Sequence, residues 1–205
     1  MRYLLLFAVS AFTGAFTLAF GLDSFRVEPR VYTFSTEFDI FVGEEAVATV
    51  NTEFFRFRRE FDLMQNGQKV ATGVSRVFAF GALFDSLKKI DFYDRDEQKI
   101  GEVDGLWMTT TSGKFAFYDA EGQNVGVAYI DNSKMNVHLC DPIDPSRVIA
   151  TFRCKYNPSG TCAWKIKVKE DGVIDERILF LFSSFISFAF SPEAPSPIVI
   201  RQGGG

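Results

Sequence analysis

Apolar and polar positions alternate through most of the chain between residues 35 and 170. A period of two favours strands, because successive side chains of a strand point to opposite faces of a sheet. Short polar turns interrupt the alternation roughly every 25 residues, the length of two strands with their connections. These turns lie at residues 43–45, 66–69, 94–97, 119–122 and 141–146. The pattern predicts a mainly β fold built from consecutive antiparallel hairpins.

Each turn is followed by the same short sequence, an aliphatic residue and then a small one. The five pairs are Val47 and Ala48, Val70 and Ala71, Ile100 and Gly101, Val125 and Gly126, and Ile149 and Ala150. Asn66-Gly67 and Glu121-Gly122 favour tight turns, because glycine readily adopts the positive φ that such turns need. The repetition indicates one type of hairpin used several times.

A different pattern begins at residue 176. Residues 178–190 read ILFLFSSFISFAF without a charge, Asp175 is a suitable N-cap, and Pro192 stops a helix. As a helix this segment spans about 20 Å, too little for a bilayer core of about 30 Å. A helix that is apolar on all sides must be surrounded by protein. We therefore expect a hydrophobic helix near residues 176–190, enclosed by the sheet; a pair of core strands is the alternative.

Composition adds limits to this picture. The 205 residues suit one domain, 24 of them are Phe, and 47% are hydrophobic, as in ordinary globular proteins with bulky cores. The net charge of −4 is unfavourable for general binding to nucleic acid or to an anionic membrane surface, although it leaves room for a local basic face. No nucleic-acid partner is expected.

The N-terminal segment differs from the rest of the chain. After Arg2, residues 3–22 carry no charge, and small residues occur where a signal peptidase would cut. Residues 1–21 are therefore predicted to be a cleaved export signal, with an uncleaved membrane anchor or a buried element as alternatives. The expected division is then a β domain over residues 22–191 and a flexible tail over 192–205. Cleavage would make the protein extracytoplasmic or secreted.

The chain has three cysteines. Cys154 and Cys162 flank a turn with the sequence NPSG, so a disulfide across that hairpin is expected in an oxidising compartment, with Cys140 free. Buried thiols are the alternative. No CxxC pair occurs and His138 is the single histidine, so neither a zinc site nor another cofactor is expected.

The arrangement of hairpins before one apolar helix resembles the tubby C-terminal-like superfamily, which includes tubby proteins, phospholipid scramblases and LURP-one-related proteins. The resemblance covers most of residues 35–190. It lies in the segments DLMQNGQKVATG (62–73), DFYDRDEQKIGEV (91–103), FYDAEGQNVGVAYI (117–130) and DERILFLFSSFISFAF (175–190). It implies a closed antiparallel β-barrel of about twelve strands threaded by the helix. Closure also removes exposed sheet edges.

The resemblance implies contact with lipids. Tubby proteins bind phosphoinositide headgroups through basic residues, and scramblases are associated with lipid movement, calcium and acylated cysteines. This chain lacks a cysteine cluster and a proline-rich N-terminal region, and residues 170–175 offer too few oxygen ligands for a calcium loop. The activity that carries over is therefore binding of lipid or of a membrane surface, without catalysis.

Alternating lysines supply candidate residues for such binding. On a strand, Lys165, Lys167 and Lys169 share one face and could hold anionic lipid headgroups, and Arg56 and Arg58 form a shorter basic row. The alternative is a solvated strand face, with lysines that guard a sheet edge.

Two other functions remain open on the sequence. One is an exported structural or protein-interaction domain without a small ligand. The other is an enzyme, which is not expected because no serine-centred elbow or second histidine accompanies His138.

Overall fold

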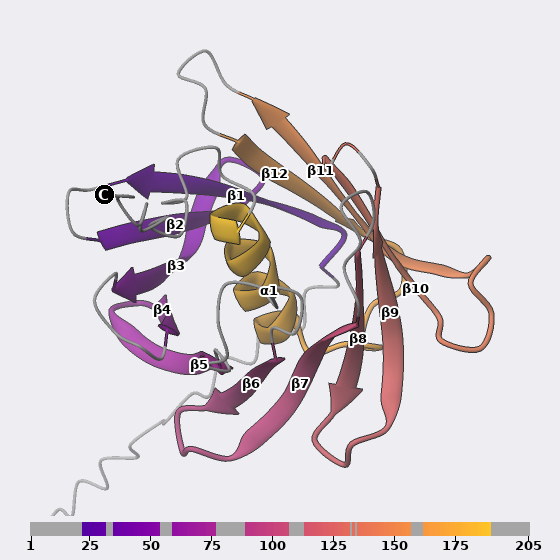
Figure 1. The fold of residues 1–205 in the computed structure, drawn as a ribbon. Helices are drawn as coiled ribbons and strands as arrows, with labels where there is room; N and C mark the ends of the chain where they lie inside the picture. Colours follow the sequence, from indigo (N-terminus) through magenta and orange to yellow (C-terminus); the bar gives the residue numbers. More distant parts are fainter. Residues whose placement is uncertain are drawn as a thin grey trace, which may run out of the picture.

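The computed structural model describes residues 22–31, 35–53, 59–76, 89–106, 113–131, 133, 135–156 and 162–189. This part of the chain forms twelve strands followed by one helix (Figure 1). The strands are β1 (Ser24–Val31), β2 (Ser35–Val42), β3 (Glu45–Glu53), β4 (Arg59–Gln65), β5 (Gln68–Arg76), β6 (Lys89–Asp94), β7 (Lys99–Leu106), β8 (Gly113–Asp119), β9 (Asn124–Ile130), β10 (Asn136–Cys140), β11 (Val148–Tyr156) and β12 (Cys162–Val168). The helix is α1 (Glu176–Ala189).

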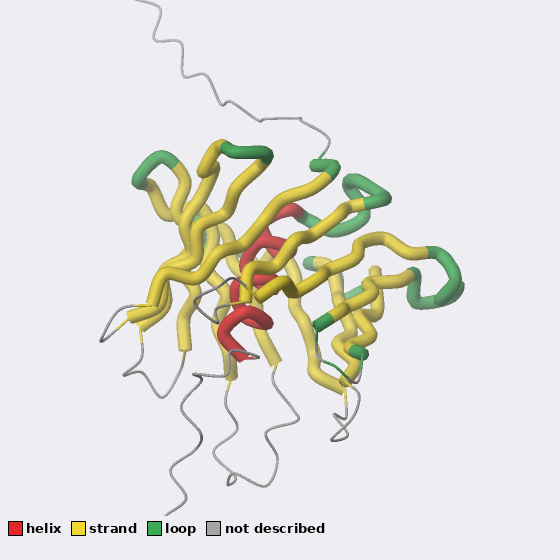
Figure 2. The backbone as a smooth tube through the Cα atoms, turned by 90° about the horizontal axis from the view of Figure 1, so that it is seen from above, coloured by secondary structure: helices red, strands yellow, loops and turns green. Residues whose placement is uncertain are grey.

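The strands form a closed antiparallel barrel. Each strand pairs with its neighbours in sequence, and β1 pairs with β12 to complete the ring. The predicted mainly β fold, a closed barrel with one hydrophobic helix, is confirmed. Viewed from above, the strands surround the helix (Figure 2). The barrel alone does not identify the superfamily that the sequence resembles.

The turns expected from the sequence connect alternate strand pairs and therefore lie at the same end of the barrel, which we call the turn end. Each of these five hairpins contains a register shift. The small residue after the turn stands opposite a large residue of the preceding strand, in the pairs Ile40–Ala48, Leu63–Ala71, Phe92–Gly101, Phe117–Gly126 and Leu139–Ala150. The aliphatic residue before it occupies the bulge. Bulges increase strand twist at a barrel rim, which explains why this residue pair recurs.

The helix begins where the sequence predicts. The Asp175 carboxylate accepts a hydrogen bond from the backbone N–H of Arg177 at 2.9 Å, as an N-cap residue does. Ser183 and Ser184 donate to the carbonyl oxygens four residues earlier, at 2.6 and 3.0 Å. These bonds satisfy two hydroxyls that would be costly to bury unpaired. Because residues 176–189 form one helix, the alternative of two core strands is wrong, and all residues from 178 to 188 are buried.

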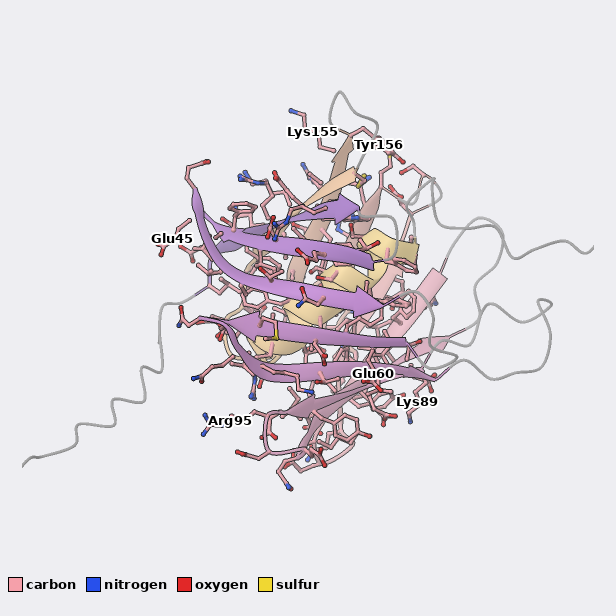
Figure 3. The ribbon with its side chains drawn as sticks, turned by 90° about the vertical axis from the view of Figure 1, so that its left-hand side faces the viewer. Glu45, Glu60, Lys89, Arg95, Lys155 and Tyr156 are labelled. Atoms are coloured by element: carbon pink, nitrogen blue, oxygen red, sulfur yellow. A yellow bond between two sulfur atoms is a disulfide. The ribbon has the colours of Figure 1, made fainter. Side chains whose placement is uncertain are left out.

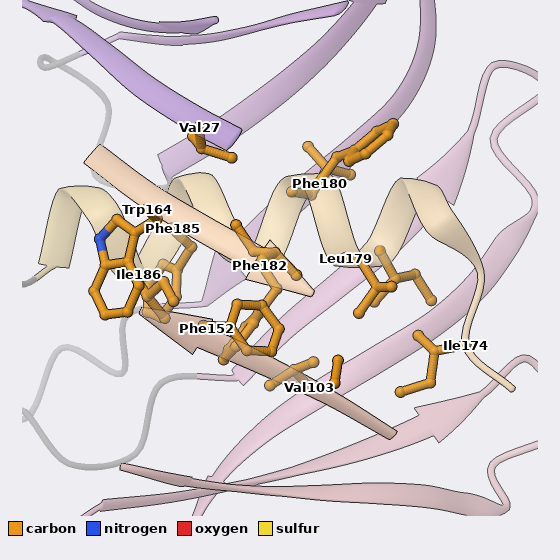
Figure 4. Packing of buried hydrophobic residues seen from close by; sticks show 14 of the residues in the cluster. Val27, Val103, Phe152, Trp164, Ile174, Leu179, Phe180, Phe182, Phe185 and Ile186 are labelled. Atoms are coloured by element: carbon orange, nitrogen blue, oxygen red, sulfur yellow. The ribbon is translucent and has the colours of Figure 1, made fainter. Parts of the chain in front are cut away.

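Aromatic rings join the helix to several strands of the barrel. The Phe182 ring meets Phe117 of β8 at a centroid distance of 4.8 Å and Phe152 of β11 at 5.8 Å, both edge to face. On another side, Phe180 meets Phe25 of β1 at 4.8 Å. Figure 4 shows Phe152, Phe180 and Phe182 among the side chains packed along the helix. The bulky core expected from the phenylalanine content therefore fills the space between helix and strands.

Several predictions fall on residues outside the described part of the chain. These are the signal or anchor at 1–21, the tail at 192–205, and the basic row of Arg56 and Arg58. Among the described residues, no helix has the length and hydrophobicity needed to cross a membrane.

Candidate anion-binding surface

Five cations lie along the outer surface of the β11–β12 hairpin. We call them the basic patch, and they are Arg153, Lys155, Lys165, Lys167 and Lys169. All five side chains are exposed. They alternate with the buried Trp164, Ile166 and Val168 on β12, as the period of two predicts. Lys169 directly follows the last residue of β12. Between the level of Lys155 and that of Lys169 the patch is roughly 20 Å long, at about 3.3 Å per residue.

The strand register places like charges side by side. Lys165 stands opposite Arg153 of β11 and, on its other side, opposite Arg26 of β1. Residues directly opposite on one face are about 5 Å apart, and like charges there destabilise a sheet. Lys167 lies between the hydroxyl residues Thr151 and Ser24. Two cations flanking Lys165, and hydroxyls beside Lys167, form a surface suited to oxyanions.

The five patch cations differ from the other basic residues of the barrel. None of the five forms an ion pair with any residue that the structure describes. Every other lysine or arginine with a described side chain has an acidic or aromatic partner. The partners are Arg26 with Glu28, Arg30 with Asp39, Lys69 with Asp62, Lys89 with Glu102, Arg95 with Asp96, Lys99 with Asp91, Arg147 with Asp141, Arg177 with Asp175, and Lys114 over the Tyr129 ring. Among the lysines and arginines whose side chains the structure describes, those without a partner therefore all lie on one hairpin.

The acidic residues next to the patch are engaged elsewhere. The Glu170 carboxylate accepts a hydrogen bond from Arg147 Nε at 2.8 Å. The Asp171 carboxylate accepts one from the backbone N–H of Gly172 at 3.0 Å. The ion pair with Arg147 offsets the charge of Glu170, so Glu170 neutralises Lys169 less than composition alone suggests.

Exposed apolar side chains lie at both ends of β11. Ile143, in the turn before this strand, is 92% exposed, and Tyr156 at its far end is 46% exposed. Lys155 and Tyr156 project from the end of the strand (Figure 3). Tyrosine suits a membrane interface because its ring is apolar and its hydroxyl is polar.

A disulfide joins the two strands that carry the patch. Cys154 of β11 and Cys162 of β12 are bonded, with their Cα atoms 5.7 Å apart. Both side chains are on the inner face of the hairpin, because Cys154 alternates in phase with the buried Phe152 and Cys162 in phase with the buried Trp164. The bond ties the strands together beneath Arg153 and Lys165.

The third cysteine is buried and unbonded. Burial raises the pKa of the Cys140 thiol, and the positive charge of Lys169 opposes that rise. The thiol donates to the backbone carbonyl oxygen of His138 at 3.9 Å, while the His138 side chain is exposed. A neutral buried thiol is a poor nucleophile. Among the described residues, no group of three or more His, Cys, Asp or Glu side chains is placed to hold a metal ion.

The structure thus places the three predicted lysines together and adds two cations. Arg153 and Lys155 have the same alternation as Lys165 and Lys167, on the other side of the NPSG turn, and this signal was available in the sequence. Searches against family models and against curated proteins find no match for this chain.

Proposed function

We propose that this domain binds anionic membrane surfaces without catalysis, through the basic patch on β11 and β12. The observation that carries the proposal is the set of five cations without ion-pair partners among the described residues, in a protein of net charge −4. Each lysine or arginine close to an acidic leaflet contributes about 1 kcal/mol of attraction. Ile143, in the turn before β11, and Tyr156, the last residue of β11, are exposed apolar side chains at the two ends of that strand.

Vesicle flotation tests the proposal. We expect the protein to float with phosphatidylcholine vesicles that contain phosphatidylserine and to stay unbound with phosphatidylcholine alone. Charge reversal at Lys165→Glu, Lys167→Glu and Lys169→Glu should weaken binding about 100-fold, because three contributions of about 1 kcal/mol are lost.

A matched triple variant controls for net charge. Lys69→Glu, Arg95→Glu and Lys114→Glu change the charge equally, but on other parts of the barrel. This variant should retain most of the binding, because its three positions lie outside the basic patch. It should also stay folded, because surface ion pairs contribute little to stability. Binding that ignores vesicle charge, or that falls equally in both variants, would refute a specific role for the basic patch.

The alternative use is an exported structural or protein-interaction domain. The disulfide supports an extracytoplasmic location, since such bonds persist in oxidising compartments. That location, and the export signal at residues 1–21, stay predictions. A protein that leaves acidic vesicles unbound would favour this alternative.

A further inference from the structure

Two hollows lie next to each other at the turn end of the barrel. The larger, which we call the apolar pocket, has a volume of about 510 Å³. Its apolar wall consists of Leu22, Val42, Val47 and Phe180. Small-molecule sites are typically apolar concavities of about 300 to 1,000 Å³, so the pocket is large enough for one extended hydrocarbon chain.

The smaller hollow is polar, and we call it the head hollow. It has a volume of about 180 Å³ and is lined by Arg26, Lys165 and Glu44 together with Phe25 and Phe41. Ser24 and Gly43 line both hollows, so the two spaces share a wall. A ligand with an apolar and a polar part can therefore occupy both.

The cations of the head hollow are arranged for a phosphate. Arg26 and Lys165 are directly opposite on adjacent strands, which places two positive side chains about 5 Å apart at their bases. Charge-assisted hydrogen bonds from arginine and lysine to phosphate are among the strongest polar contacts in proteins. The Arg26 guanidinium stacks on Phe41 at 4.7 Å, which holds it beside the hollow.

Carboxylates around these spaces select against a purely anionic ligand. Glu44 is 3.9 Å from Arg26 and its side chain is 95% exposed, so it can turn toward a bound group. Asp23, Glu45 and Glu176 line the apolar pocket. Burial raises the pKa of the Glu176 carboxyl, and Asp175 and Asp171 raise it further. A positively charged group next to Glu44 would compensate the repulsion between this carboxylate and a bound phosphate.

We infer that the turn end binds one single-chain zwitterionic phospholipid. Its hydrocarbon chain lies in the apolar pocket, its phosphate contacts Arg26 and Lys165, and its amine faces Glu44. This site holds a single lipid molecule and is separate from the binding of a membrane along the basic patch, although Lys165 belongs to both.

Calorimetric titration of the full chain with dodecylphosphocholine, below the concentration at which it forms micelles, tests the inference. We expect saturable binding of one molecule per chain. Dodecyltrimethylammonium lacks the phosphate and phosphocholine lacks the chain, so each should bind at least tenfold more weakly. Absence of saturable binding, or equal binding of dodecyltrimethylammonium, would overturn the assignment.

Variants locate the two parts of the site. Val42 is 39% exposed, so Val42→Glu should fold, put a charge in the apolar pocket and weaken dodecylphosphocholine binding at least tenfold. Lys165→Gln should weaken dodecylphosphocholine about tenfold without weakening dodecyltrimethylammonium, whereas Lys114→Gln should alter neither. Unchanged dodecylphosphocholine binding by Val42→Glu would contradict the inference. Because Val42 is outside the basic patch, that variant should still float with acidic vesicles, which separates this test from that of the proposed function.

Discussion

Replacement of Phe182 by alanine is expected to lower the free energy of unfolding by about 3 to 5 kcal/mol, the range for a buried Phe→Ala change. The ring is fully buried and meets Phe115, Phe117 and Phe152 from two sides of the barrel. Its removal leaves a cavity that the closed ring of strands cannot fill by collapse. Urea unfolding followed by circular dichroism measures the change.

Phe41→Ala is the matched control for this prediction. Phe41 is half-buried on the outer face of β2, under the Arg26 guanidinium. Its loss removes a surface cation–π contact worth about 1 kcal/mol at most. Equal destabilisation by the two variants would show that the helix is not enclosed as described.

Replacement of Gly101 by alanine is expected to destabilise the protein by about 2 kcal/mol, as overpacking of a tight core does. A Cβ atom at this position would lie 2.6 Å from the Tyr118 carbonyl oxygen and 2.7 Å from Ile178 Cδ1. The Ile178 methyl belongs to the helix and can rotate, but the Tyr118 carbonyl belongs to the barrel backbone. Strand β7, which carries Gly101, must therefore shift relative to β8.

Gly73→Ala separates this effect from the general preference for glycine. At Gly73 the nearest atom to an added Cβ is Cε1 of the Phe92 ring, at 3.2 Å, which needs only a small movement. The gain from a less flexible unfolded chain, about 0.4 to 1 kcal/mol, offsets that movement. The same unfolding assay should place Gly73→Ala within about 1 kcal/mol of the wild type. Similar losses at both positions would contradict the role given to Gly101.

The repeated hairpins were predictable because local chemistry determines them. Asn66 and Gly67 have φ values of 50° and 74°, as a tight hairpin turn requires, and this dipeptide is a strong signal in any sequence. The helix was also predictable, because residues 178–190 are too apolar for water and too short for a bilayer. Asp175 marks its start with an N-cap bond.

Other features depend on contacts between distant residues. The sequence shows that a small residue follows each turn, but only the register shows that Gly101 faces Phe92 and approaches the helix. The pairing of Arg26 with Lys165 follows from closure between β1 and β12, which are far apart in the chain. The apolar pocket likewise joins residues from the two ends of the described chain, Leu22 and Phe180.

The basic patch was predictable in part from the sequence. Alternation predicted that Lys165 and Lys167 share the outer face, and the structure places them there. That Arg153 lies beside Lys165 follows from the register of one hairpin, and the absence of acidic partners among the described residues follows from the whole barrel. The arrangement reduces stability where Lys165 faces Arg153, because like charges directly opposite each other destabilise a sheet; Arg26, on the other side of Lys165, is paired with Glu28. Residues kept at a cost to stability are characteristic of binding sites.

Comparison of stability and vesicle binding in the single variant Lys165→Glu tests this account most directly. A glutamate between Arg153 and Arg26 replaces two repulsive neighbours with two attractive ones. We expect the free energy of unfolding to rise by about 0.5 kcal/mol while binding to vesicles containing phosphatidylserine falls about fivefold. A variant that binds these vesicles as tightly as the wild type, or that is less stable, would contradict the account.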